Sequence, residues 1–115
     1  MQYIQPAHVA STTFTVSTTA GTLQSFMDVA GSADNSAALR EANGIDICIE
    51  ANEARVCFDG LTPTATDGLL LQANADSKIY KFRNCDLTKI RLIRDAAADV
   101  EISVQIGKTL PGQSE

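Results

Sequence analysis

The chain has 115 residues, of which 44% are hydrophobic and 20% charged, and its net charge is -5. This balance is typical of a folded globular protein rather than a disordered one, and the length suits one domain with its own core. An acidic chain lacks the clustered Lys and Arg that counterion release requires, so neither DNA nor RNA is expected as a ligand.

No apolar run approaches a length of about 20 residues, which crossing a bilayer requires. The N-terminus also lacks the basic start and apolar stretch of a secretory signal. We therefore expect a protein made in a cytoplasm, without a membrane partner. Three cysteines without C-x-x-C spacing indicate reduced thiols rather than a disulfide framework or a zinc site.

Residues 1–8 are expected to form an extended arm, because Pro6 blocks a helix start and no periodicity is visible. Tyr3 and Ile4 are its sizeable apolar groups, which makes them candidates for docking on a neighbouring subunit. An ordinary frayed terminus is the alternative. Residues 9–19 alternate apolar side chains with Ser and Thr, which predicts a strand whose hydroxyl face meets water or a partner.

A short helix is expected to begin after Thr22, whose side chain can cap it. Apolar residues then follow at helical spacing, at Leu23, Phe26 and Met27. This helix should plug one end of a sheet core. Residues 31–43 are the least regular part of the chain and should form a surface excursion.

Residues 44–58 predict a hairpin with a two-residue turn at 52–53. The expected register separates an apolar face from a polar one and places Cys48 opposite Cys57. A disulfide between these two cysteines is therefore the alternative to reduced thiols.

A loop rich in turn-forming residues follows the predicted hairpin. Asp59 and Gly60 form one turn pair, and Gly68 completes a second Asp-Gly pair. Between them Pro63 biases the preceding residue towards an extended conformation. We expect these four residues to have structural roles.

Further strands are predicted at residues 68–74, 78–83, 87–94 and 99–106, with a polar tail from about residue 107. The short connection between the last two strands favours their antiparallel pairing. Residues 87–94 carry large apolar side chains at both odd and even positions. Such a pattern is expected of a strand that is covered on both faces or lies at a subunit interface. The interface candidates in this strand are Ile90, Arg91, Leu92 and Arg94.

Six or seven strands with frequent turn signals and one short helix predict an all-β fold, an antiparallel sandwich or barrel. Residues 1–115 should form one domain, with an arm at about 1–8 and a tail at about 107–115.

Few residues could carry chemistry. The single histidine, His8, lies on the predicted arm, where it is a poor general base. Asp59, Asp67 and Asp76 lie at predicted turns and have the oxygen ligands that calcium prefers, but Asp in a turn bonds its own backbone without a metal. We therefore expect no enzyme activity, no metal and no cofactor. The absence of Trp counts against a sugar-binding platform.

The segment from Phe58 to Thr64 reads Phe-Asp-Gly-Leu-Thr-Pro-Thr, and it is followed by Gly68-Leu69-Leu70 and by the Lys-Ile-Arg-Leu-Ile-Arg run of residues 89–94. After a Thr-rich first strand and a short helix, this order of motifs resembles small virion structural proteins of tailed bacteriophages. The likeness spans about residues 13–104. The chain departs from that pattern in its longer segment 31–43 and in the cysteines of the predicted hairpin.

The resemblance implies a β-rich, non-enzymatic virion component made in the host cytoplasm. A head decoration or cement protein that binds the major capsid protein is the first hypothesis, and we expect a homo-oligomer, with a trimer as the working assumption. The alternatives are a glycan- or host-binding module of a tail or head fibre, and a structural protein of the neck or tail.

Overall fold

The computed structural model describes residues 7–64, 66–73, 79–95 and 98–108. In chain order the elements are β1 (Ala7–Val16), β2 (Gly21–Thr22), α1 (Leu23–Gly31), α2 (Ser36–Glu41), β3 (Gly44–Ala51), β4 (Glu53–Cys57), β5 (Leu69–Gln72), β6 (Ile79–Arg83), the 3-10 turn η1 (Leu87–Lys89), β7 (Arg91–Arg94) and β8 (Val100–Lys108).

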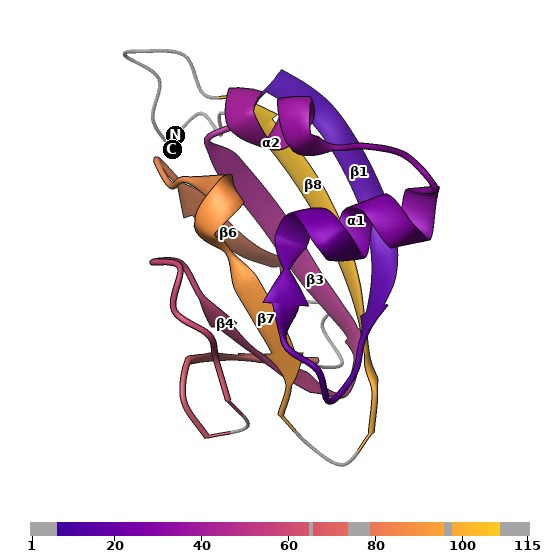
Figure 1. The fold of residues 1–115 in the computed structure, drawn as a ribbon. Helices are drawn as coiled ribbons and strands as arrows, with labels where there is room; N and C mark the ends of the chain where they lie inside the picture. The colour runs from indigo at the N-terminus through magenta and orange to yellow at the C-terminus, as the bar shows by residue number, and fades with distance from the viewer. Residues whose placement is uncertain (1–6, 65, 74–78, 96–97, 109–115) are drawn as a thin grey trace.

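The strands form two four-stranded antiparallel sheets (Figure 1). Sheet A has the order β1-β8-β3-β6, and sheet B has the order β2-β7-β4-β5. The prediction of an all-β fold with antiparallel sheets is confirmed. The segment expected to be irregular contains a second, six-residue helix, α2, which buries Leu39.

Both sheets and both helices contribute to one hydrophobic core. Every second residue of β8 is almost fully buried, and these residues are Val100, Ile102, Val104 and Ile106. The alternation seen in the sequence therefore marks the inner face of this strand correctly. Leu23 and Met27 of α1 enter the same core, so α1 covers it as predicted.

The predicted hairpin of residues 44–58 is wrong. β3 pairs with β6 and β8 in sheet A, whereas β4 pairs with β5 and β7 in sheet B. Between them Asn52 has a φ of +66° and turns the chain from one sheet to the other. Alternation shows which face of a strand is buried but does not identify its neighbour, and a corner between sheets has the same pattern as a hairpin.

The cysteines are separated by this arrangement. Cys48 lies opposite Ser103 and Ile79 in sheet A, while Cys57 lies opposite Arg91 in sheet B. All three cysteines are free thiols. The predicted pairing of Cys48 with Cys57 is therefore corrected.

The second predicted hairpin, between residues 87–94 and 99–106, is wrong for the same reason. β7 belongs to sheet B and β8 to sheet A. The boundaries of the predicted arm and tail also shift, because Ala7 pairs with Lys108 and His8 with Gly107. These four residues belong to strands rather than to the predicted arm and tail.

Helix α1 begins as the sequence indicates, with the backbone N–H of Ser25 donating to Thr22 Oγ1 at 3.1 Å. At its other end Asp28 holds the connection to α2. Asp28 Oδ1 accepts from the backbone N–H of Asn35 at 2.7 Å and from its side-chain amide at 2.8 Å. The side-chain bond from Asn35 is the main reason why the pKa of Asp28 lies below its ordinary value of 3.8.

A first prediction concerns the corner at Asn52. The amide of Asn52 donates to the carbonyl of Asp99 at 2.7 Å, and both Asn52→Ala and Asn52→Gly remove that bond. Only the Ala variant must also place a Cβ in the left-handed conformation, so we expect it to be less stable than the Gly variant by about 1 kcal/mol. Urea unfolding followed by circular dichroism measures the difference, and equal stabilities would contradict the assigned role of the backbone.

A second prediction concerns Asp28. Its lowered pKa means that the folded state favours the carboxylate, so this stabilisation is present above about pH 4 and is lost as the pH falls through the folded pKa. Asp28→Asn should therefore be less stable than the wild type at pH 7, and the gap should close at lower pH. Urea unfolding of both proteins across this range is the measurement. A gap that does not change with pH would contradict the prediction.

Candidate functional site

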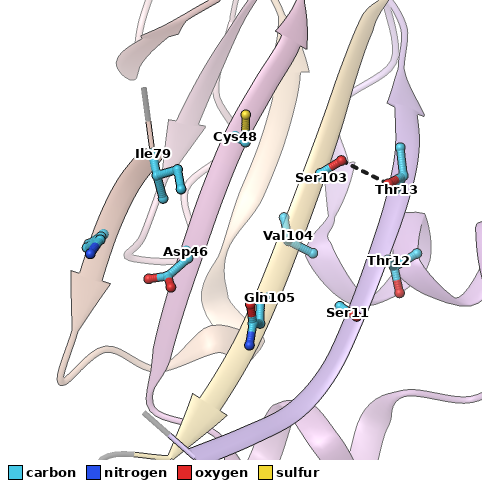
Figure 2. Close-up of a pocket in the computed structure, with 10 residues that line it drawn as sticks. Ser11, Thr12, Thr13, Asp46, Cys48, Ile79, Ser103, Val104 and Gln105 are labelled. Carbon is cyan, nitrogen blue, oxygen red and sulfur yellow. Dashed lines mark hydrogen bonds between the residues drawn. The ribbon is translucent and has the colours of Figure 1, made fainter. Parts of the chain in front are cut away.

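The outer face of sheet A is hollowed into an open groove of about 490 Å³ (Figure 2). Two rows of side chains cross it, and each row takes one residue from each of the four strands. The first row is Ser11, Gln105, Asp46 and Lys81, and the second is Thr13, Ser103, Cys48 and Ile79. The groove is therefore assembled from residues more than ninety positions apart in the sequence, as Ser11 and Gln105 are.

Hydroxyl groups dominate the half of the groove that is formed by β1 and β8. Ser103 Oγ donates to the carboxylate of Glu50, and Ser103 Oγ lies 2.8 Å from Thr13 Oγ1 (Figure 2). A serine hydroxyl has one proton, so Thr13 is the donor in the second bond. This chain of bonds orients three side chains across three strands.

Charged groups occupy the other half. Asp46 Oδ1 accepts from Arg83 Nη1 at 2.9 Å, and both side chains are half-buried. Gly44 lies opposite Arg83 in the register, and a Cβ at this glycine would be 3.1 Å from Arg83 Cδ. The absence of a side chain at Gly44 thus leaves room for the arginine to reach Asp46.

The groove offers many groups for hydrogen bonding. The residues lining the groove offer hydroxyls, an amide, a carboxylate and an amine. Such a set can hold a polar ligand or a polar protein surface.

Two thiols lie outside the groove. Burial raises the pKa of Cys85 above its ordinary value of 9.0. Burial, followed by the charges of Asp59 and Asp67, does the same for Cys57. Both thiols are therefore protonated at neutral pH, which makes them poor nucleophiles.

The interface predicted in residues 87–94 needs correction. Ile90 and Leu92 are 0% and 1% exposed, so they pack in the core of their own chain. Leu87 is buried from the turn η1, which accounts for its different parity from the buried Ile90 and Leu92, whereas Ile93 lies on the opposite face of β7 and is half-buried. Arg91 and Arg94 are half-buried, and Arg94 Nη1 lies 2.7 Å from Asp99 Oδ1.

Three candidates fall outside the described residues, namely Tyr3, Ile4 and Asp76. His8, which was expected on the arm, has its backbone in β1. Among the residues that the structure describes, no three His, Cys, Asp or Glu side chains gather in a group that could hold a metal ion.

The loop that follows β4 contains the predicted turn residues. Asp59 Oδ1 accepts from the backbone N–H of Leu61 at 3.2 Å, and Gly60 has a φ of +83°. Pro63 is buried. Gly68 has a φ of +121°, and a Cβ there would lie 3.2 to 3.3 Å from Val56 O, Arg55 Cβ and Pro63 Cβ.

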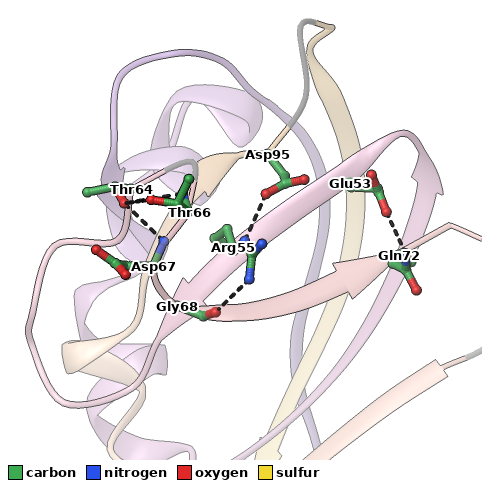
Figure 3. Close-up of polar contacts among 8 residues, drawn as sticks. All are labelled: Glu53, Arg55, Thr64, Thr66, Asp67, Gly68, Gln72 and Asp95. Atoms are coloured by element: carbon green, nitrogen blue, oxygen red, sulfur yellow. Dashed lines mark hydrogen bonds and ion pairs between the residues drawn. The ribbon is translucent and has the colours of Figure 1, made fainter.

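Arg55 connects this loop to sheet B (Figure 3). Its Nε lies 2.8 Å from Asp95 Oδ1, and its Nη1 donates to the carbonyl of Gly68 at 3.1 Å. Within the loop, Thr64 Oγ1 accepts from the backbone N–H of Asp67 at 3.0 Å, and Thr64 N–H donates to Asp67 O at 3.0 Å. The loop thus has a defined shape although most of it is exposed.

The chain matches no protein-family model, no curated protein and no solved structure. In the described part of the chain, no helix is long and apolar enough to span a membrane. The resemblance to phage virion proteins therefore remains a prediction based on the motifs in the sequence.

A third prediction tests the loop. Gly68→Ala should lower the free energy of unfolding by about 1–3 kcal/mol, because the positive φ and the three close atoms oppose a Cβ. Gly31→Ala is the matched control, since its φ is not positive and nothing lies within 4 Å of the added Cβ. Its stability should be unchanged or raised by up to about 1 kcal/mol. Urea unfolding of both variants checks this, and equal losses would refute the assigned role of Gly68.

Proposed function

We propose that this protein is a non-enzymatic structural component of a tailed-phage virion, a decoration or cement protein that binds the major capsid protein of the head. The proposal rests on how the loop from Phe58 to Gly68 is held in place and which of its side chains it exposes. This loop contains the motif on which the resemblance rests, and its residues divide into those that fix its shape and those that it exposes.

The shape-fixing residues are Arg55, Gly60, Pro63 and Gly68, through the contacts given above. The exposed residues include Leu61, which is 64% exposed, and Leu69, which is 51% exposed at the start of β5. Apolar side chains held on a defined loop are well suited to contact another protein, because little conformational freedom is lost on binding.

The mechanism is burial of additional interface without a chemical step. A stable contact between proteins buries about 800 Å² on each partner. A small subunit that contacts neighbouring capsid proteins adds such an area at the junction between them and thereby raises the resistance of the head to internal pressure.

The groove of sheet A favours a second candidate, a module of a tail or head fibre that binds host glycan. Its hydroxyl, amide and carboxylate groups can bond to sugar hydroxyls. Among the described residues none that lines the groove is aromatic, whereas sugar sites generally use an aromatic face. We therefore place this function second.

The fourth prediction tests the capsid proposal. Purified protein should co-sediment with phage heads assembled without it, and Leu61→Ser should weaken this binding at least tenfold, because a buried leucine is worth about 1.5–3 kcal/mol. Ile79→Ser is the matched control, since it removes a side chain of similar size and exposure from the groove, and its binding should not change.

The outcomes separate the candidates. No binding to heads would contradict the capsid proposal, and binding to isolated necks or tails alone would place the protein there. Specific binding on a glycan array that Ile79→Ser abolishes and Leu61→Ser leaves intact would favour the glycan-binding candidate.

A further inference from the structure

β1 lies at a rim of sheet A and, within the described chain, pairs on one side only, with β8 (Figure 1). The register shifts between His8 and Ala10, and the seven residues from Ala10 to Val16 then pair without interruption. Alternate residues of an edge strand direct their N–H and C=O groups away from the sheet. This rim therefore presents a row of backbone donors and acceptors.

From Ala10 to Val16 the rim carries none of the charged or proline residues that commonly protect an edge strand. The sequence of β1, AHVASTTFTV, contains no Lys, Arg, Asp, Glu, Pro or Gly. The other edge strands of the two described sheets are shorter, with two residues in β2, four in β5 and five in β6, and β6 also carries Lys81 and Arg83. A long uncharged edge is a template for pairing with a further strand.

A second copy of the same strand fits this edge. Ser11, Thr13 and Thr15 are exposed on the outer face, while Phe14 and Val16 point into the core. In an antiparallel pair about a two-fold axis, the numbers of any two facing residues add to the same total. When that total is even, outer residues of one copy face outer residues of the other, for example with Thr13 opposite Thr13. Each such register forms a row of facing hydroxyl groups, which are favourable cross-strand pairs.

Charge also favours self-pairing at this rim. Each copy has a net charge of -5, so most surfaces of two copies repel each other. Along β1 no carboxylate of one copy faces a carboxylate of the other. The rim is thus a place where two acidic chains can approach without opposing like charges.

An exposed apolar group near this rim supports the same conclusion. Helix α1 lies against β1, where the rings of Phe26 and Phe14 stack with centroids 5.5 Å apart. Val29 follows Phe26 by three residues, so it lies on the same side of the helix, and it is 82% exposed. Val29 is thus an exposed apolar group on the helix that packs against the rim strand.

We propose that two copies of this chain associate by antiparallel pairing of β1 with β1, which joins their sheets into one continuous eight-stranded sheet. The pairing is two-fold and gives a dimer rather than the trimer expected from the sequence. A closed trimer would require β1 to meet a different edge, such as β6 with its two cationic residues. This inference goes beyond the proposed function and does not depend on it.

The fifth prediction is tested with the full chain by sedimentation velocity and native mass spectrometry. The wild type should have the mass of two chains, and the double variant Ser11→Lys, Thr15→Lys should dissociate at least tenfold more readily, because it places like charges on both sides of the two-fold axis. The matched control is Glu101→Gln, Gln105→Lys, which changes the net charge by the same two units on the neighbouring strand β8. It should remain dimeric.

Hydrogen exchange adds a readout for the strand itself. Those amides of residues 10–16 that point away from β8 should become more protected as the protein concentration rises, and those of β6 should not. The proposal is overturned by a chain that stays monomeric up to about 1 mM, by a mass of three chains, or by a lysine variant that dimerises like the wild type. Protection that is independent of concentration would also overturn it, since the edge would then be covered by its own chain. Protection that appears only on phage heads would assign the edge to a capsid strand instead.

Discussion

Sheet A can form only when the two ends of the chain meet, because β8 pairs with β1 on one side and with β3 on the other. The inner face of β8 also forms much of the core, and its partner β1 comes from the opposite end of the sequence. Contacts between residues so far apart must be made before the core exists, which is typical of slowly folding β topologies. The groove and the free rim both depend on this pairing.

The sequence predicted which faces of the strands are buried but not which strands are neighbours. In β3, β4 and β8 the alternating residues point inwards as expected. The short connections at Asn52 and at residues 95–99 were interpreted as hairpins, although both carry the chain between sheets. The spacing of apolar residues cannot distinguish a hairpin from a corner between sheets. In both cases the buried faces of the two consecutive strands point towards the same core.

The candidate surfaces were predicted unevenly for a related reason. The hydroxyl face of β1 was visible in the sequence, since Ser and Thr recur at every second position from Ser11 to Thr15. The rest of the groove comes from three strands whose order no local pattern encodes. Ile90 and Leu92 were misassigned to an interface because Leu87 and Ile93 gave the segment apolar residues at both odd and even positions, although Leu87 lies in a 3-10 turn before β7. The sequence signal for that turn was Asp86, whose Oδ1 accepts from the N–H of Thr88.

The pairing of Ala7 with Lys108 also has a practical meaning for protein engineering. The described chain enters and leaves sheet A at one end, while the Val16–Val100 pair and the bond from Asn52 to the Asp99 carbonyl lie at the other. Adjacent strand ends of this kind favour circular permutation, in which a short linker joins Lys108 to Ala7 and new ends open in an exposed loop. A tag attached beside Ala7 or Lys108 would lie at one pole of sheet A and leave the opposite pole unobstructed.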